Sequence, residues 1–196
     1  MAGSNAAQSH LVRFGRTTIE VAIGDLVDQP VAVLIATGNK RAMFGAGAAS
    51  TLWSAAGEDV ERELRSHAPL EMGTAVITGS GRLTERVVTN IVHAIVAPAL
   101  GEPARPLLIP DAIEQALDLA TEAGARSIAI SIIGASDSTS PDERVGRAEV
   151  VIDVLIAHLR TRKHRIERGI LVSRFEDDRA PLESLVVRAR ERRWTS

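Results

Sequence analysis

The stretch VAVLIA at residues 31–36 is an uninterrupted apolar run that begins directly after Pro30. A strand with one face in water alternates apolar and polar residues, whereas a strand covered on both faces is apolar throughout. A second, nearly apolar run, SIAISII, occupies residues 127–133. We therefore expect two central strands in a sheet that helices cover on both faces.

Weaker strand patterns alternate with helix patterns on either side of these two runs. The other strands are expected at residues 12–14, 18–23, 74–78, 87–96 and 169–175, with a loop at residues 37–47. Helices are expected at residues 48–56, 58–67, 141–161 and 181–190, with one more through residues 113–120 that ends at Gly124. The alternation predicts an α/β fold, a three-layer α/β/α sandwich around a mixed, mostly parallel sheet.

The helix expected at residues 141–161 has the clearest start. Ser140 is placed to cap it, Pro141 fits its first turn, and Glu143 stands three residues after the cap. Residues 160–168 at its other end hold six basic side chains, counting His164. Cations there meet the unpaired carbonyls of the helix end, so we interpret this run as a solvated helix terminus rather than a binding patch.

The chain has 196 residues, 45% of them hydrophobic and 24% charged, without an internal repeat or a low-complexity linker. A chain of this length buries roughly 70% of its unfolded surface, so a core needs no metal or disulfide support. We expect a flexible N-terminal end at residues 1–9 and a single domain at residues 10–196. The start lacks a signal-peptide pattern and no apolar run could span a bilayer, which predicts a cytoplasmic protein.

Several functional classes are excluded or disfavoured by composition. The net charge of −2 argues against a dedicated nucleic-acid binder, and three Phe, two Trp and no Tyr offer few platforms for stacked bases. The absence of cysteine excludes thiolate chemistry. The five histidines show no ligand spacing and no P-loop, GxSxG or HExxH pattern occurs, so we predict no metal and no cofactor. His93 lies in a predicted strand and is interpreted as a hydrogen-bonded histidine of the core or of its rim rather than a catalytic one.

Glycine-containing loops follow both central strands. Gly45 and Gly47 come after residues 31–36, and Gly134 comes directly after residues 127–133. Loops at the carboxyl ends of sheet strands form the ligand crevice of α/β proteins, and main-chain amides at helix starts bind phosphate. The two loops together predict a diphosphate site, although each glycine could also simply make a turn.

A dinucleotide-binding Rossmann fold is a weaker alternative. GAGAAS at residues 45–50 and GASDS at residues 134–138 contain glycines similar to its fingerprint. However, about eight residues separate Ala36 from Gly45, whereas the fingerprint turns directly from strand to helix. The spacing therefore counts against an NAD-dependent oxidoreductase.

Six segments form an ordered set of short motifs. They are GDL at residues 24–26, LIATGN at 34–39, FGAGAAS at 44–50, GTAVITGSGRL at 73–83, IVHAIVAP at 91–98 and IGASDSTSP at 133–141. In order and spacing, from about residue 19 to residue 187, the chain resembles the macro domain family, the ADP-ribose-binding module. The corresponding family motifs read GDI or GDL, VNAAN, GGGVDxA, GxAxxTxGxxL, VIHxVGP and ISTGxxGxP.

The resemblance implies a role for individual residues. Asp25 would accept a hydrogen bond from the adenine amino group, with Leu26 beside it. Asn39 would bind the distal ribose and, as the candidate catalytic residue, hold the attacking water. Main-chain amides would bind the two phosphates, those of Gly45, Ala46, Gly47 and Ala48 one of them, and those of Gly134, Ala135, Ser136, Asp137 and Ser138 the other.

Two departures from the family lie in the first motifs, and the second of them concerns hydrolysis. Ala36 stands where the family has its first asparagine. Ala49 stands where many ADP-ribosyl hydrolases of the family carry an aspartate that positions or activates water. The absence of this aspartate argues against strong hydrolysis without excluding it, because the pyrophosphate of the substrate can itself assist the water.

Three further departures lie in the second loop. Ser136 and Thr139 replace family glycines, and Ser138 stands where an aromatic residue usually covers the ribose. Side chains in place of glycine restrict the backbone, so we expect a reshaped loop. Asp137 would repel a diphosphate unless its carboxylate is turned away.

Two main hypotheses follow. The first is a domain that binds ADP-ribose or a derivative, free or on an ADP-ribosylated protein, with weak hydrolysis of ADP-ribosyl groups or O-acetyl-ADP-ribose as an added activity. The second is a macro-like scaffold or interaction protein whose altered loops no longer hold ADP-ribose tightly. Neither hypothesis involves a membrane or nucleic acid.

Overall fold

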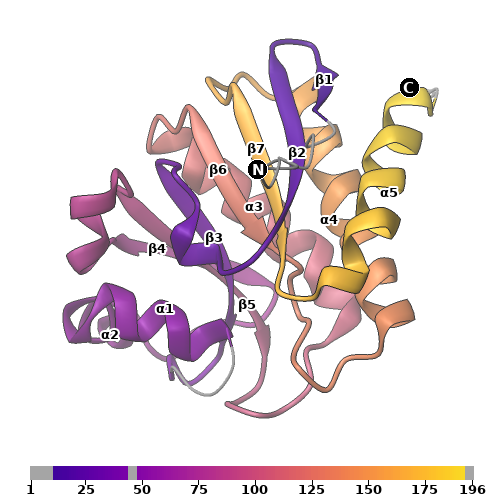
Figure 1. Cartoon of the computed structure of the whole chain (residues 1–196). Coiled ribbons are helices and arrows are strands. Elements are labelled where there is room, and N and C mark those ends of the chain that lie inside the picture. Colours follow the sequence, from indigo (N-terminus) through magenta and orange to yellow (C-terminus); the bar gives the residue numbers. More distant parts are fainter. Residues whose placement is uncertain (1–10, 44–47, 193–196) are drawn as a thin grey trace, which may run out of the picture.

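Strands β3 (Val33–Asn39) and β6 (Ser127–Ser131) lie side by side and parallel inside a seven-stranded sheet. The computed structural model describes residues 11–43 and 48–192. The other strands are β1 (Val12–Phe14), β2 (Thr17–Ile23), β4 (Thr74–Gly79), β5 (Asn90–Ala97) and β7 (Arg168–Ser173). Their order across the sheet is β1-β2-β7-β6-β3-β5-β4 (Figure 1). Both runs predicted as central strands are confirmed.

The sheet is mixed and mostly parallel, as predicted. Strands β2, β7, β6, β3 and β5 run parallel to one another, and the two outermost strands, β1 and β4, are antiparallel to their neighbours. The carboxyl ends of the five parallel strands therefore meet along one edge, the lower edge in Figure 1. We call this the carboxyl edge.

Helices cover both faces of the sheet. Helices α1 (Ala48–Ala56) and α2 (Glu58–Ser66) lie on one face, and α3 (Ile109–Glu122), α4 (Pro141–Thr161) and α5 (Arg179–Glu191) on the other (Figure 1). Short 3-10 helices occur at η1 (Leu26–Asp28), η2 (Gly81–Arg86), η3 (Pro106–Leu108) and η4 (Glu176–Asp178). The predicted three-layer sandwich is confirmed.

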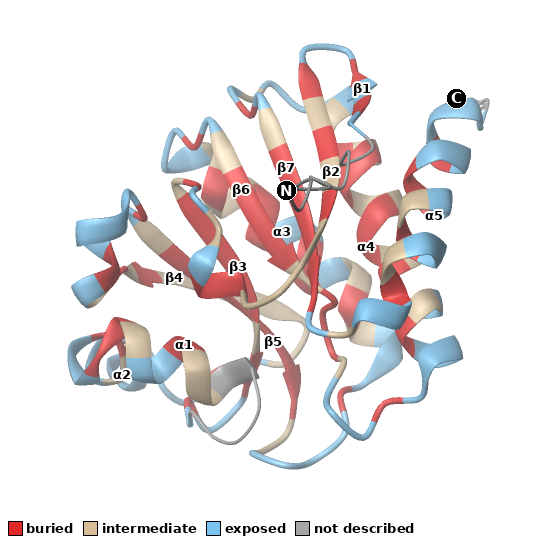
Figure 2. Cartoon of the chain, viewed as in Figure 1, coloured by how far each residue is buried: buried red, intermediate tan, exposed pale blue. Residues whose placement is uncertain are grey.

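The packing of β3 explains why its sequence is apolar throughout. Val33 and Ile35 belong to the core formed with α3, α4 and α5. Leu34 and Ala36 point the other way and belong to the core beneath α1 and α2. Figure 2 shows the inner strands buried and the outer helix faces exposed. Each fully buried aliphatic side chain of this kind contributes about 1.5–3 kcal/mol.

Helix α4 has the predicted bounds and the predicted start. The Glu143 amide donates to Ser140 Oγ at 3.3 Å, and the Ser140 amide donates to Glu143 Oε2 at 3.3 Å. Ser140 and Glu143 thus form a complete capping box, with Pro141 in the first turn. This cap fixes the end of the loop that follows β6.

One boundary prediction matters for the site. Strand β3 continues to Asn39, so the prediction that a loop begins at residue 37 was wrong. Residues Thr37 and Gly38 pair with Ala94 and Ile95 of β5, and this pairing outweighs the low strand preference of glycine. As a result, Asn39 is placed by the sheet itself.

Other boundaries shift by a few residues. The strand predicted from residue 87 begins at Asn90, because η2 precedes it and Val87 adopts a left-handed conformation with φ of 71°. The strands predicted to end at residues 133 and 175 end at Ser131 and Ser173. The N-terminal end predicted at residues 1–9 lies outside the described residues.

Candidate ligand-binding site

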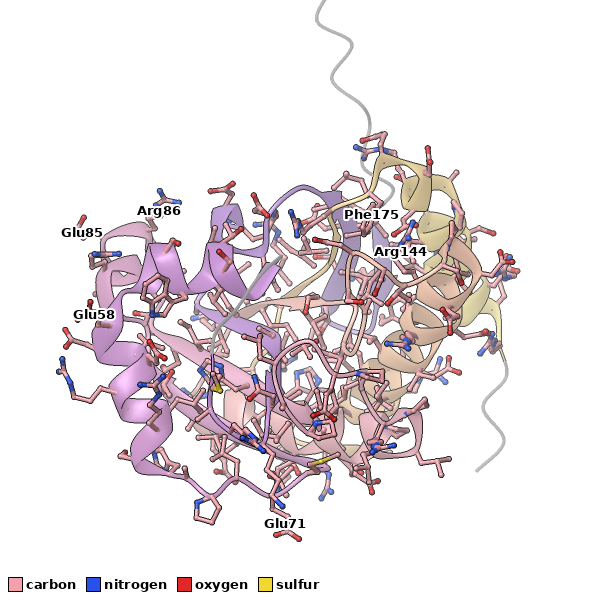
Figure 3. The ribbon with its side chains drawn as sticks, turned by 90° about the horizontal axis from the view of Figure 1, so that it is seen from below. Glu58, Glu71, Glu85, Arg86, Arg144 and Phe175 are labelled. Carbon is pink, nitrogen blue, oxygen red and sulfur yellow. The ribbon has the colours of Figure 1, made fainter. Side chains whose placement is uncertain are left out.

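The predicted site residues that the structure describes lie along the carboxyl edge. Asp25 follows β2, Asn39 ends β3, and the loop of residues 134–138 follows β6. Hydrogen bonds join neighbouring strand ends: the Gly24 amide donates to Ser173 O at 2.8 Å, and the Gly134 amide donates to Thr37 Oγ1 at 2.9 Å. Segments far apart in sequence are thus brought to one edge, which Figure 3 views from below.

Asn39 is almost completely buried, with 8% of its surface exposed. Its Oδ1 accepts from the amides of Arg41 (3.2 Å) and Met43 (3.3 Å), and its Nδ2 donates to Met43 O at 2.5 Å. These bonds close the turn after β3, in which Ala42 has a left-handed φ of 51°. A carboxamide nitrogen carries two hydrogens, so one N–H of Asn39 has no acceptor within the described residues.

The loop after β6 uses several of its own amides. Three of the five predicted phosphate-binding amides donate within the protein: Gly134 to Thr37 Oγ1 (2.9 Å), Ala135 to Ile132 O (3.0 Å) and Ser136 to Thr139 Oγ1 (2.9 Å). The amides of Asp137 and Ser138 have no acceptor in the part of the chain that the structure describes. Within this loop, these two amides are the ones left to contact an anion.

The hydroxyls of the same loop form a small network. Ser136 Oγ lies 3.0 Å from Ser138 Oγ and 3.2 Å from Thr139 Oγ1. The side chains that replace family glycines therefore shape the loop by bonding to one another and to its backbone. Sequence reasoning expected a reshaped loop but did not identify Thr37, whose hydroxyl ties this loop to β3.

Gly134 is required by the fold itself. Its φ is +80°, and a Cβ at this position would lie 2.9 Å from Ala104 Cβ and 3.0 Å from Ile109 Cδ1. Its carbonyl accepts a hydrogen bond from Arg147 Nη1. A turn and close packing therefore explain this glycine without any ligand.

Arg174 lies between two predicted ligand residues and was missed from the sequence. Its Nε is 3.5 Å from Asp25 Oδ1, and its Nη1 is 3.2 Å from Asp137 Oδ1. Its side chain is 37% exposed, so these pairs are solvated and individually weak. Their effect is to place a positive charge at the end of β7, between the ends of β2 and β6, where it faces the Asp137 carboxylate.

A buried ion pair anchors the loop from behind. Arg144 of α4 donates to both carboxylate oxygens of Asp178 and, through Nη1, to Thr139 O at 2.8 Å. Its guanidinium lies 3.9 Å from the centre of the Phe175 ring, beside which it is seen in Figure 3. Ser173 Oγ donates to Asp178 at 2.5 Å. Burial alone would raise the pKa of Asp178, but the hydrogen bonds from Arg144 and Ser173 hold it below its usual value.

The first predicted phosphate loop is only partly described. Gly45, Ala46 and Gly47 lie outside the described residues, and Ala48 is the first residue of α1. Ala49 is the second residue of the same helix. The roles of these residues stay predictions.

His93 is buried in β5, which agrees with the core position, one of the two interpreted from the sequence. Its Nε2 lies 3.1 Å from Thr78 Oγ1, and burial lowers its pKa from 6.5 to about 3. The imidazole is therefore neutral at ordinary pH. It lies within the sheet, and its hydrogen bond to β4 gives it a structural role.

Neither a metal centre nor a membrane span is evident in residues 11–43 and 48–192. Across these residues, His, Asp and Glu side chains nowhere gather in groups of three or more that could hold an ion. The helices described there are too short or too polar to cross a bilayer.

A family model identifies the family of the chain, and solved structures share its fold. The family model for the Macro domain matches residues 35–148, more than half of the chain, and the chain belongs to this family. Among solved structures, it resembles a mutant macrodomain of Oceanobacillus iheyensis with ADPR, at a TM-score of 0.79 and 17% identity, covering 94% of this chain and 100% of the other. A Trypanosoma brucei macrodomain in complex with ADP-ribose gives a TM-score of 0.72 at 18% identity, covering 86% and 68%.

Curated relatives match over part of their length. An uncharacterized protein of Aeropyrum pernix is 35% identical over 124 residues, 62% of this chain and 62% of that protein. The ADP-ribose glycohydrolase MACROD1 of Rattus norvegicus is 27% identical over 157 residues, 79% of this chain and 59% of the relative. The match thus spans about three fifths of each of these two relatives.

Proposed function

We propose that this chain binds ADP-ribose, or a close derivative of it, along the carboxyl edge. The observation that supports this most directly is the meeting of Asp25, Asn39 and the loop of residues 134–138 at that edge. Two solved relatives carry ADPR or ADP-ribose, which agrees with a ligand of this class. The ligand would be a small molecule or the same group attached to a protein.

The order of these residues along the edge suits the order of groups in ADP-ribose. The sheet places the end of β2 first, then β7, β6 and β3. Asp25 at β2 would accept the adenine amino group, and the amides of Asp137 and Ser138 at β6 would donate to the diphosphate. The remaining N–H of Asn39 at β3 would donate to the distal ribose. A linear ligand could therefore contact all three segments in sequence.

We propose that any hydrolysis is weak. Both acceptor positions of the Asn39 carboxamide oxygen are taken by the amides of Arg41 and Met43, so this oxygen is poorly placed to orient water. Ala49 has no carboxylate to take that role. Slow release of ADP-ribose from an ADP-ribosylated protein or from O-acetyl-ADP-ribose, lost in Asn39→Ala, would agree with this assignment. Release that is unchanged in Asn39→Ala would contradict it.

Calorimetric titration with ADP-ribose, AMP and NAD tests the proposal. We expect micromolar binding of ADP-ribose that Asp25→Ala weakens about tenfold or more, because the amino group of the ligand would lose its charged acceptor. Asp28→Ala is the matched control: it removes an exposed aspartate three residues away that pairs with Arg86. Loss of binding in both variants would contradict a specific role for Asp25.

One set of contacts favours the scaffold alternative. Three amides of the second loop are already occupied, and the Asp25 carboxylate already faces Arg174. A protein with no affinity for ADP-ribose, AMP or NAD would agree with a macro-fold scaffold. A preference for intact NAD would instead favour a dinucleotide-binding protein.

A further inference from the structure

A cavity of about 620 Å³ lies at the carboxyl edge, beyond Asn39. It is lined by Lys40, Arg41, Ala68, Pro69, Pro98 and Glu102. The Lys40 amide donates to Ala97 O at 2.9 Å, and the Gly73 amide donates to Ile95 O at 2.8 Å. The first bond holds Lys40 at the end of β5, and the second joins β5 to the residue before β4.

The cavity continues the line of the proposed ligand. Along the sheet, β5 follows β3 on the side away from β2 and β6. A ligand that runs from Asp25 to Asn39 would therefore end with its distal ribose toward this cavity. A group attached to that ribose would leave the site here.

The charges of the cavity are unequal. Lys40 and Arg41 are exposed, and no carboxylate pairs with either side chain within the described residues. By contrast, Arg86, Arg126 and Arg168 each have an acidic partner. Among the described residues that line the cavity, Glu102 is the one that is acidic. The remaining described walls are alanine and proline side chains, so the described lining has a net positive charge and contains no aromatic ring.

We propose that this cavity holds the polypeptide next to an ADP-ribosylated residue, and that Lys40 and Arg41 select segments with acidic side chains there. This inference rests on the proposed function, since it concerns the group attached to a bound ADP-ribose. Two cations opposed by one carboxylate suit one or two peptide carboxylates better than a nucleic acid, which is held through many phosphate contacts and base stacking.

The test compares four probes by calorimetry. They are ADP-ribose alone, a peptide with one ADP-ribosylated residue flanked by glutamates, the same peptide flanked by glutamines, and an ADP-ribosylated oligonucleotide. We expect the glutamate peptide to bind roughly tenfold more tightly than ADP-ribose and the glutamine peptide, from two solvated charge pairs. Added salt should reduce this advantage.

Two matched double variants test whether the tighter binding of the glutamate peptide depends on the cavity. In Lys40→Ala/Arg41→Ala the advantage of the glutamate peptide should disappear while ADP-ribose affinity is unchanged, because Asn39 is bonded to the backbone amide of Arg41, which alanine keeps. Lys163→Ala/Arg165→Ala removes the same two charges from exposed positions after α4, at the opposite edge of the sheet, and should keep the advantage.

Three results would overturn the inference and leave ADP-ribose binding intact. The first is equal affinity for the glutamate and glutamine peptides. The second is an equal loss of affinity for the glutamate peptide in both double variants. The third is binding tighter than that of ADP-ribose by the oligonucleotide but not by the glutamate peptide. If ADP-ribose itself does not bind, the proposed function fails and the inference fails with it.

Discussion

The carboxyl edge has two halves with different electrostatics. Over β2, β7 and β6, the charges are paired: Arg174 faces Asp25 and Asp137, and Arg144 is buried against Asp178. Over β3 and β5, Lys40 and Arg41 have no acidic partner in the part of the chain that the structure describes. The half over β2, β7 and β6 therefore contains its own counter-charges. The half over β3 and β5 has positive charge that a ligand could neutralise.

This difference separates charge that holds the fold from charge that is free to bind. Arg144 and Asp178 lie behind the second loop and share hydrogen bonds with Thr139 and Ser173. Removing either partner should affect stability, because a buried charge is left alone. Removing a solvated charge should affect only the ligands that meet it. The predictions below test this division.

The largest effect is expected for Arg144→Ala. The variant leaves the Asp178 carboxylate, of which 1% is exposed, without its cationic partner. Loss of one member of a buried pair costs about 3–5 kcal/mol of unfolding free energy. Urea unfolding followed by circular dichroism measures this cost.

Arg179→Ala is the control for Arg144→Ala. Arg179 pairs with Glu176 only a few residues from Asp178, but the Glu176 side chain is 70% exposed. We expect little change in the urea midpoint. If the two variants were equally stable, the buried pair would not be what anchors the loop.

A second prediction concerns pH and His93, which is buried within β5. Burial holds the pKa of His93 at about 3, below the 6.5 of an exposed histidine, so the folded protein does not take up the proton that the unfolded chain takes up. Above pH 6.5 this group leaves the free energy of unfolding unchanged, because His93 is neutral in both states. Between pH 6.5 and 3 only the unfolded chain binds the proton, so the free energy of unfolding decreases as the pH falls. The slope is about 1.4 kcal/mol per pH unit for one such group.

Chemical denaturation between pH 7 and pH 5 measures this slope, above the range in which most carboxylates titrate. His93→Gln, which keeps a side chain able to hydrogen-bond Thr78, should reduce the slope by one group's contribution. His158, whose pKa burial also lowers, should keep part of the slope in the variant. An unchanged slope in His93→Gln would show that His93 is not responsible.

How much of this could be predicted from the sequence depends on the kind of contact. The runs at residues 31–36 and 127–133 predicted the central strands, because a strand buried on both faces has apolar residues at consecutive positions. The capping box of α4 was predicted for the same reason, since Ser140 and Glu143 are local to each other. Local patterns therefore defined the fold class well.

Contacts across the sheet could not be predicted in this way. Arg174 meets Asp25 and Asp137 only because β7 lies between β2 and β6, an order that differs from the order along the chain. The extension of β3 to Asn39 likewise depends on pairing with β5. The sequence does place a cation, Arg174, near the end of a predicted strand, and this position could have marked it as a candidate site residue. Its acidic partners could be identified only from the order of the strands in the sheet.

The smallest effect is expected for Arg174→Ala, and it should depend on the ligand. Without Arg174, the Asp137 carboxylate faces the proposed diphosphate unopposed, so ADP-ribose should bind about threefold to fivefold more weakly. Adenosine has no phosphate and should bind as before or slightly better, because Asp25 loses a competing partner. Calorimetry with both ligands measures the contrast.

Asp137→Asn in the Arg174→Ala background completes the comparison. If Arg174 acts by neutralising Asp137, removing both charges should restore most of the lost ADP-ribose affinity, giving a coupling between the two substitutions. The urea midpoint should stay near that of the parent in Arg174→Ala, in Asp137→Asn and in the variant with both substitutions, because both side chains are solvated. Equal weakening of adenosine and ADP-ribose binding would mean that Arg174 supports the shape of the carboxyl edge and does not act through its charge. The charge pairing over β2, β7 and β6 would then not explain ligand binding in that half.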